Sequence, residues 1–316
     1  MGIFNRKRPV IAIDAGTENL RVSHNGQVIF DEATAIAIHL EKQKIDQIGN
    51  PAASSKGLQI IWPYDYVIKD FQAFEMLLKG VTHKVNQKAL LPSPSKMFFS
   101  VPPGASEVDL RAFRDAGEHN NAIEIYMCRS SLLAALGLDI LSSQQSFLLV
   151  DFSASKFEVT AFINGKPDVN QTLQLGSQKL EKLISNHLKR NNNLEAYIDE
   201  VRQILNSYGS REETLTIQYQ PIELAPVRDI IDSYLSLAED TLRSCVESID
   251  LGKQSRIREQ GIYFTGGGSL YRSVCDVLVS KVKMTAHYSE HPLGDIISGL
   301  KIVSQEPDGY KGYLIV

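Results

Sequence analysis

The sequence predicts an α/β protein made of two halves with the same local order. In each half an apolar strand ends in an aspartate, and small residues, a second strand, an Asn-Gly turn and a third strand follow. The first half begins at 9–16 and turns at Asn25-Gly26, and the second begins at 147–151 and turns at Asn164-Gly165. Few all-α or all-β architectures would produce this order together with the helical segments described next.

Helices and further strands are expected between and after these meanders. Phe71, Phe74 and Leu77 recur at helical spacing, and Ser106 with Asp109 three residues later is typical of a helix N-terminus. The expected elements are a helix over 70–83, a buried strand over 96–101, helices over 177–189 and 195–207, a polar strand over 213–219, a long helix over 227–248, a strand from 261 into a glycine turn, and a strand over 286–289.

Composition excludes several classes of protein. With 316 residues, 43% of them hydrophobic and 22% charged, the chain is expected to be a soluble protein of two domains. A formal net charge of -4 gives no electrostatic reason to expect a nucleic-acid ligand. Three widely spaced cysteines fit neither a disulfide framework nor a zinc site, which favours a reducing cytoplasm. No apolar run approaches the ~20 residues that cross a bilayer.

Three turns share one local chemistry: 14–19 (DAGTEN), 151–156 (DFSASK) and 265–269 (TGGGS). In the first two, the acid at the strand end is suited to a metal-bound water, and the backbone N–H groups that follow are suited to an anion. Each turn alone is also consistent with a plain strand connection. Their recurrence in both halves favours a phosphate-binding role.

Five segments resemble one family in composition and in order. They are IDAGTENLRV, WPYDYVIKDFQAFEMLLKG, FFSVPPGASEVDLRAFRDAGEHNNAIEIY, IYFTGGGSLYRSV and AHYSEHPLGDIISGLKIV, and together they extend from Ile11 to about Val303. The chain resembles the superfamily of actins, sugar kinases and heat-shock-chaperone ATPases, and within it the MreB-like bacterial actins.

This resemblance implies an actin-like two-lobed α/β fold, with duplicated ribonuclease-H-like domains whose mixed sheets are flanked by helices. The lobes would be 1–140, with a small subdomain at about 32–70, and 141–303, with a small subdomain at about 178–240; 304–316 would be a C-terminal tail. It further implies ATP or ADP with Mg²⁺ in the cleft. Filaments on the inner face of the cytoplasmic membrane and contacts with other cell-shape proteins are also implied.

The resemblance also assigns site residues. Asp14 and Asp151 would lie near the metal. Glu200 would contact the ribose and Arg202 the base, although both would equally fit a solvated helix face. The remaining nucleotide-binding positions would be Gly16, Thr17, Glu18, Asn19, Ser153, Ala154, Ser155, Gly266, Gly267, Gly268 and Ser269.

Two departures from the family pattern bear on chemistry. The second phosphate loop reads DFSASKFEV where the family has roughly DIGGGTTEV, so added Cβ atoms crowd the backbone and strain any residue that needs positive φ. Lys156 is either a compensating cation or an exposed turn lysine. Arg129 and Ser130 stand where the family carries an acid that orients water, so hydrolysis is expected to be weak or absent.

Two segments predict membrane contact. Ile3 and Phe4 lie beside three cations at the N-terminus, and Leu90 and Leu91 lie in a lysine-bearing loop where the family has its membrane loop. The bland alternatives are a frayed basic terminus and a leucine pair folded back on its own domain.

The sequence therefore predicts a membrane-associated filament protein that binds ATP and hydrolyses it poorly. A non-polymerising scaffold or adaptor on the same fold is the alternative. A small-molecule kinase is the weakest candidate, because no general-base carboxylate follows the strand containing Met127.

Overall fold

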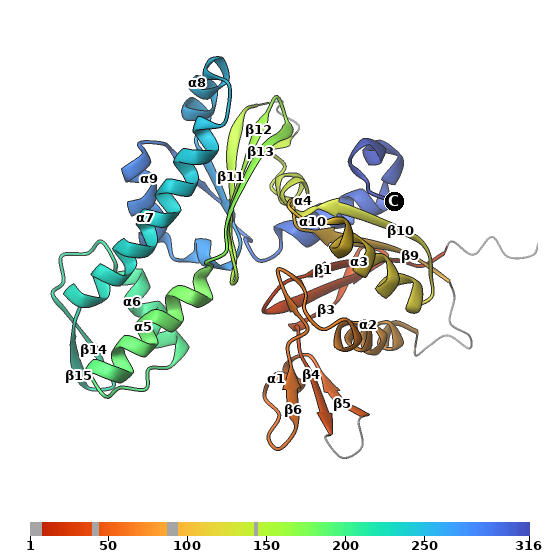
Figure 1. Cartoon of the computed structure of the whole chain (residues 1–316), viewed down its shortest axis with the longest axis horizontal. Helices are drawn as coiled ribbons and strands as arrows, with labels where there is room; N and C mark the ends of the chain where they lie inside the picture. Colours follow the sequence, from red (N-terminus) through yellow and green to blue (C-terminus); the bar gives the residue numbers. More distant parts are fainter. Residues whose placement is uncertain (1–7, 40–43, 87–93, 142–144) are drawn as a thin grey trace, which may run out of the picture. The chain divides into compact units, whose positions relative to one another are not determined.

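The computed structural model describes residues 8–39, 44–86, 94–141 and 145–316. The chain divides into two compact units, which we call unit 1 (residues up to Asp139, with Gly294–Val316) and unit 2 (Ile140–Leu293). Each unit contains its own five-stranded sheet and its own hydrophobic core (Figure 1).

The two sheets have the same topology. Unit 1 has the order β10-β9-β1-β2-β3, in which β1, β2 and β3 form an antiparallel meander and β9 and β10 add in parallel beside β1. Unit 2 repeats this arrangement as β13-β12-β11-β16-β17. The strands are β1 (Val10–Ala15), β2 (Asn19–His24), β3 (Gln27–Ala33), β9 (Ser95–Val101), β10 (Ala122–Arg129), β11 (Phe147–Phe152), β12 (Phe157–Ile163), β13 (Lys166–Leu173), β16 (Ile262–Thr265) and β17 (Ala286–Tyr288). The predicted duplication of a mixed, ribonuclease-H-like sheet is confirmed.

Each meander turns at its Asn-Gly pair. Asn25 and Gly26 have φ of 49° and 83°, and Asn164 and Gly165 have φ of 51° and 74°. Positive φ at both central residues is the type I′ geometry that suits the twist of a hairpin, and Asn-Gly is the pair that adopts it most readily. Both predicted hairpins are confirmed.

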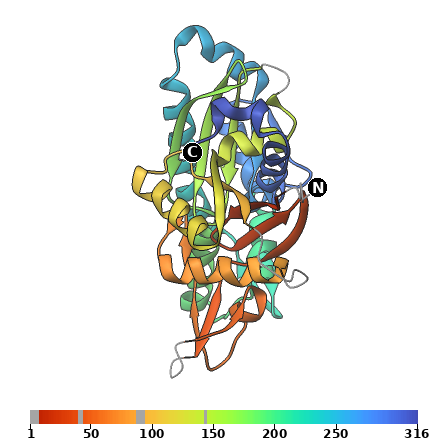
Figure 2. The same ribbon diagram turned by 90° about the vertical axis from the view of Figure 1, so that its right-hand side faces the viewer.

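Helices flank the sheet of unit 1. They are α2 (Phe71–Asn86), α3 (Glu107–His119), α4 (Ser130–Gly137) and α10 (Asp295–Gln305). The predicted cap of α3 is confirmed, since the Ser106 side chain accepts from the Asp109 N–H and the Asp109 carboxylate accepts from the Ser106 N–H. A small sheet lies beyond α2 in the view of Figure 2; it contains β4 (Ile36–His39), β5 (Lys44–Ile48) and β6 (Gln59–Ile61) and packs with α1 (Asn50–Ala53). The pair β7 (Tyr64–Asp65) and β8 (Val67–Ile68) and the 3-10 segment η3 (Pro307–Tyr313) complete unit 1.

The C-terminal helix α10 belongs to unit 1, whereas the sequence grouped its residues with the second lobe. It packs against α4 and β1. Two glycines allow the helices to approach backbone to backbone: a Cβ on Gly299 would lie 1.9 Å from the Leu133 carbonyl oxygen, and one on Gly137 would lie 2.0 Å from that of Asp295.

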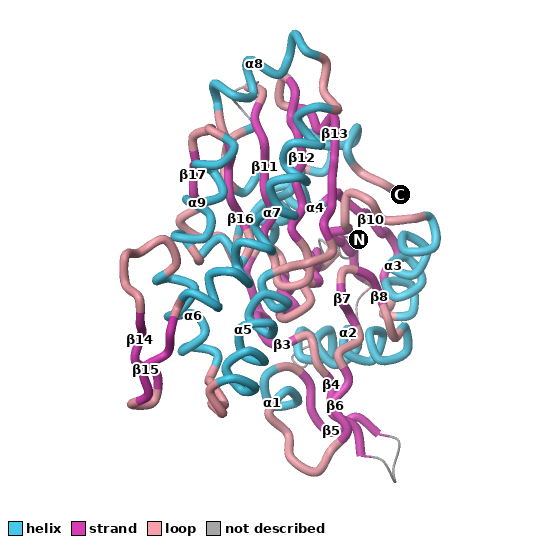
Figure 3. The backbone as a smooth tube through the Cα atoms, turned by 60° about the vertical axis from the view of Figure 1, so that its left-hand side comes forward, coloured by secondary structure: helices cyan, strands magenta, loops and turns pink. Residues whose placement is uncertain are grey.

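Unit 2 carries its helices on the same plan. They are α5 (Ser177–Asn191), α6 (Ile198–Ser207), α7 (Ala225–Glu247), α8 (Leu251–Gln260) and α9 (Arg272–Val282), with the 3-10 turn η2 (Gly267–Leu270) after β16. A hairpin of β14 (Thr214–Ile217) and β15 (Gln220–Glu223) lies near α6 (Figure 3). The prediction of one strand over 213–219 was wrong, because the chain turns at Gln218 and Tyr219, with φ of 50° and 64°. Neither residue type signals such a turn.

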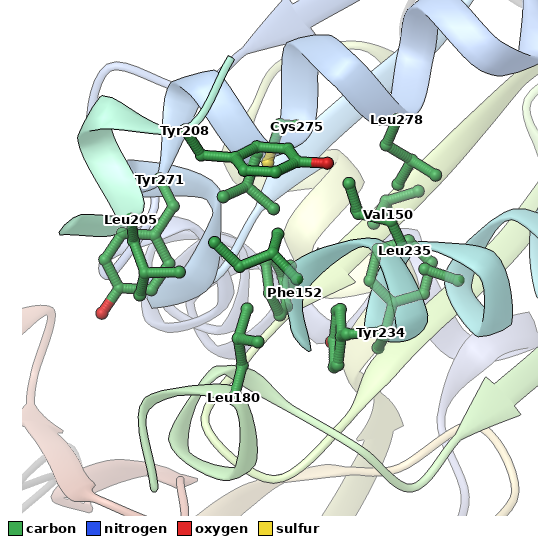
Figure 4. Packing of buried hydrophobic residues seen from close by; sticks show 14 of the residues in the cluster. Val150, Phe152, Leu180, Leu205, Tyr208, Tyr234, Leu235, Tyr271, Cys275 and Leu278 are labelled. Carbon is green, nitrogen blue, oxygen red and sulfur yellow. The ribbon is translucent and has the colours of Figure 1, made fainter. Parts of the chain in front are cut away.

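The hydrophobic core of unit 2 includes residues of its meander strands β11 and β12 and of β16, which precedes the glycine turn. Figure 4 shows Phe152 among Leu180, Tyr234 and Cys275, and the rings of Phe152 and Tyr234 stack with centroids 5.9 Å apart. Phe152 is 1% exposed, so the end of β11 is fixed by packing. In the described part of the chain, no helix has the length and apolarity needed to cross a membrane.

Candidate functional site

The first hairpin loop joins β1 to β2 and is closed by one short backbone bond. The Gly16 N–H donates to the Asn19 carbonyl at 3.0 Å, and a Cβ on Gly16 would lie 2.7 Å from that oxygen, so the turn needs glycine. The Thr34 hydroxyl donates to the Gly16 carbonyl at 2.6 Å, and the Thr34 N–H donates to the Glu18 carbonyl at 2.8 Å. Thr34 therefore holds this loop from outside with two hydrogen bonds, and the Thr17 hydroxyl adds a longer one to Asp65 Oδ1 at 3.5 Å.

Asp14 lies at the base of this loop. It is 6% exposed, and its Oδ1 accepts a hydrogen bond of 2.6 Å from the Ser100 hydroxyl on β9. A carboxylate fixed in this way is suited to a metal-bound water. The sequence analysis missed Ser100. It could have been found from its place on β9, the strand that pairs with β1 beside Asp14.

The second hairpin loop joins β11 to β12 with the same backbone bond. The Ser153 N–H donates to the Lys156 carbonyl at 3.0 Å. Among the described residues with positive φ, none lies between Phe152 and Phe157. The expected strain at the replaced glycines is therefore not present: the loop adopts a backbone that Ser153, Ala154 and Ser155 accommodate.

Lys156 is the residue of this loop whose environment differs from an expectation. It is only 7% exposed, so the interpretation as an exposed turn lysine was wrong. Its Nζ lies 3.3 Å from Asp151 Oδ2 and forms a closer ion pair with Glu158. Asn170 Nδ2 donates to the other Glu158 oxygen at 2.9 Å. We call Asp151, Lys156 and Glu158 the buried triad.

The sequence analysis missed Glu158. The signal that could have found it is the register: Asp151 pairs directly with Glu158 across the β11–β12 ladder. In a hairpin of this length the two carboxylates must share a face and lie close together. A basic residue inside such a loop is then an expected partner.

The glycine turn after β16 packs onto the second loop. A Cβ on Gly266, whose φ is 81°, would lie 2.5 Å from Asp151 Oδ1, and one on Gly268 would lie 2.6 Å from the Phe152 ring. The Ser269 hydroxyl closes the turn by donating to the Gly266 carbonyl at 2.7 Å. Unit 2 thus brings two of the predicted nucleotide segments into direct contact.

Arg202 and Glu200 lie on α6 in different surroundings. The Glu200 carboxylate accepts from the Tyr197 N–H at 2.7 Å and from Gln218 Nε2 at 2.9 Å, which makes it a helix cap. Arg202 lies beside the hydroxyl of Tyr271, which directly follows the glycine turn. Burial and then the carboxylate of Glu181 raise the pKa of Tyr271, which keeps it a neutral donor. The roles predicted for Glu200 and Arg202 toward ribose and base stay predictions.

Arg129 and Ser130 form the junction of β10 and α4. Arg129 Nη1 donates to the Pro102 carbonyl at 2.8 Å and to that of Ala105 at 3.4 Å, so the guanidinium binds the loop between β9 and α3. Ser130 is buried, and the first turn of α4 carries no acidic residue. A guanidinium has no acceptor for a proton from water.

The predicted membrane residues, Ile3, Phe4, Leu90 and Leu91, lie outside the described residues. Thr17 lies in the first hairpin loop, Asn19 begins β2 and Gly267 begins the 3-10 turn η2, and their roles toward a nucleotide stay predictions. Within the described ranges no group of three or more His, Cys, Asp or Glu side chains is arranged to hold a metal ion.

Comparison with known proteins agrees with this arrangement. The profile of the family described as MreB/Mbl protein matches residues 8–311. The cell shape-determining protein MreB of Escherichia coli K12 is 23% identical, covering 92% of this chain and 91% of its own length. MreB5 of Spiroplasma citri bound to AMPPNP superimposes with a TM-score of 0.83 at 18% identity, covering 97% of this chain and 99% of its own, and its ADP-bound structure gives the same score. The MamK double helical filament superimposes with a TM-score of 0.76 at 18% identity, covering 95% of this chain and 99% of that chain. The chain has an actin-like fold and belongs to the MreB/Mbl family.

Proposed function

We propose that this protein is an MreB-like cytoskeletal protein that polymerises into filaments and serves cell shape or intracellular organisation. The observation that carries the proposal is the family match over residues 8–311. The Escherichia coli relative is a cell shape-determining protein, and the MamK neighbour forms a double helical filament. Pelleting and electron microscopy with and without nucleotide test it, and a protein that stays monomeric in every condition would contradict it.

Nucleotide binding is the second part of the proposal. The first hairpin loop keeps the glycine turn and the buried acid, and MreB5 is seen with AMPPNP and with ADP. Asp14 is the acid whose surroundings fit Mg²⁺, which would supply charge for the phosphates. Asp151 does not fit a second cation, because the Lys156 ammonium already lies 3.3 Å from its Oδ2. Calorimetry with ATP and ADP measures the affinity.

Hydrolysis is expected to be weak or absent. The turn at Arg129 and Ser130 supplies no carboxylate to orient or deprotonate a water molecule, and general-base assistance of this kind contributes roughly 10²–10⁴-fold. Phosphate release from ATP should therefore stay near the level of a protein-free control. Rapid release that is lost in an Asp14→Asn variant would contradict this part of the proposal.

Membrane association rests on the sequence. Ile3, Phe4, Leu90 and Leu91, each near lysines or arginines, are suited to the headgroup region of an anionic bilayer. Cosedimentation with vesicles containing anionic lipid should decrease in a Leu90→Ser/Leu91→Ser variant. Equal binding of that variant and the wild type would remove the loop from the proposal.

A non-polymerising scaffold is the alternative function, and the buried triad is the observation that favours it. A second loop whose acid is already neutralised keeps its fold without a ligand. The absence of both ATP binding and filaments would move the assignment to this alternative.

A further inference from the structure

The buried triad requires a physical explanation. All three of its side chains are ionisable and buried: the exposed fractions are 6% for Asp151, 7% for Lys156 and 2% for Glu158. Burying a lysine is costly unless it is paired, and a buried pair is weak evidence for stability as such. A buried lysine in this position therefore suggests a role that an apolar residue would not fill.

The register shows what the ammonium does. Asp151 and Glu158 are direct partners across the hairpin, and two carboxylates in that position repel each other. Lys156 contacts both of them. The other oxygen of the aspartate, Asp151 Oδ1, is buried and has no hydrogen-bond partner among the described residues. One edge of this carboxylate is thus held by an internal cation, at the position where the family resemblance expects a metal.

We propose that Lys156 is a built-in cation of the second hairpin loop, which takes the place of a divalent metal at Asp151. The ammonium and a divalent ion would compete for the same carboxylate, so Asp151 holds no Mg²⁺ in this chain. The charge of the loop is then fixed by the protein and does not depend on the metal concentration. The inference deepens the proposed nucleotide site, although its first test needs no nucleotide.

The variant Lys156→Thr carries the residue expected for the family at this position. It removes the ammonium and so tests whether a divalent metal ion then binds Asp151. Without the ammonium, the two facing carboxylates form a divalent site. The nucleotide-free variant should unfold about 2–4 °C higher in 10 mM MgCl₂ than in EDTA, because metal that binds only the folded state stabilises it. The wild type should shift by less than about 1 °C under the same conditions. Asp151→Asn in the Lys156→Thr background should abolish the gain.

A second readout uses the proposed ligand. The ratio of ADP affinity in Mg²⁺ to that in EDTA should be at least about 5-fold larger for Lys156→Thr than for the wild type, because only the variant can bind metal at Asp151. A Mg²⁺-dependent shift in the wild type that Asp151→Asn removes would overturn the inference. So would a Lys156→Thr variant with no greater metal response than the wild type.

A second variant keeps the test decisive if Lys156→Thr does not fold. Lys156→Thr/Glu158→Gln removes one cation and one anion, so the net charge of the triad is unchanged while Asp151 is freed. It should show a larger Mg²⁺ response than the wild type, measured by ADP affinity or by unfolding, but a smaller one than Lys156→Thr, because only the Asp151 carboxylate remains. If no protein binds ADP, the nucleotide proposal fails, and the unfolding measurements still decide the role of Lys156.

Discussion

The two hairpin loops have the same backbone and opposite charge arrangements. Gly16 in the first and Ser153 in the second donate to the carbonyl three residues later, both at 3.0 Å. The residue directly across the ladder from Asp14 is Arg21, and the residue across from Asp151 is Glu158. The aspartate at the turn therefore faces a cationic side chain in unit 1 and an anionic side chain in unit 2.

This difference explains why only one loop contains a lysine. Arg21 is paired with Asp31 on β3, at 3.1 Å, and Asp14 is held by a neutral hydroxyl. In unit 2 the facing carboxylates need a cation, and Lys156 supplies it from within the turn. In this chain, the loop whose aspartate faces a second carboxylate is the one that contains a buried lysine.

The loops also differ in what holds them from outside. In the first, Thr34 contributes one side-chain and one backbone hydrogen bond, and Thr17 donates to Asp65 at 3.5 Å. The second is held by the start of α5, where the N–H groups of Ser177 and Gln178 donate to Ser153 and Ala154 at 2.9 and 3.1 Å. The predictions below test these differences.

The largest effect is expected at Gly176, where α5 meets the second loop. A Cβ at this position would lie 2.2 Å from the Ala154 carbonyl oxygen and 2.4 Å from the Lys156 nitrogen, both in the backbone. Gly176→Ala must displace the loop, and the free energy of unfolding of unit 2 should fall by about 3 kcal/mol. Denaturant unfolding followed by circular dichroism measures it.

The matched control for this substitution is Gly252→Ala. Gly252 lies in α8, and nothing lies within 4 Å of its added Cβ. Alanine there should raise stability by about 0.5–1 kcal/mol, because it has the higher helix propensity. Equal effects of the two substitutions would show that close packing at Gly176 is not what matters.

A smaller loss is expected from Thr34→Val in unit 1. Thr34 is fully buried, and valine keeps its shape while removing the hydroxyl that donates to Gly16 at 2.6 Å. The unfolding free energy should fall by about 1–2 kcal/mol, since the Gly16 carbonyl loses a buried donor. Thr241→Val on the exposed face of α7 loses a similar bond to Leu237 and should change stability by less than about 0.5 kcal/mol. A similar loss in both variants would assign no special role to the Gly16 contact.

The sequence predicts best where one residue type determines the geometry. Asn25-Gly26 and Asn164-Gly165 fixed both hairpins, because few other pairs adopt positive φ twice. Gln218 and Tyr219 adopt the same signs of φ without that chemistry, so their hairpin could not be foreseen.

Long-range packing was the other limit of prediction. The return of α10 to unit 1 depends on Gly137 and Gly299, which are far apart in the chain and carry no local signal of contact. In the candidate site, the acids at the strand ends were found by motif. The burial of Lys156 was not, because it depends on the partner across the ladder.

The smallest effect tests whether the second loop suffers from its missing glycines. Ala154 replaces a glycine of the family pattern, yet it is not among the residues with positive φ. Where φ is ordinary, glycine mainly adds freedom to the unfolded chain, so Ala154→Gly should destabilise unit 2 by about 0.5–1 kcal/mol. A strained loop would respond with the opposite sign, because glycine would relieve the strain. Denaturant midpoints measured at constant slope distinguish the two outcomes. An increase in stability would mean that the backbone of the second loop is strained by the side chains that replace the glycines of the family pattern.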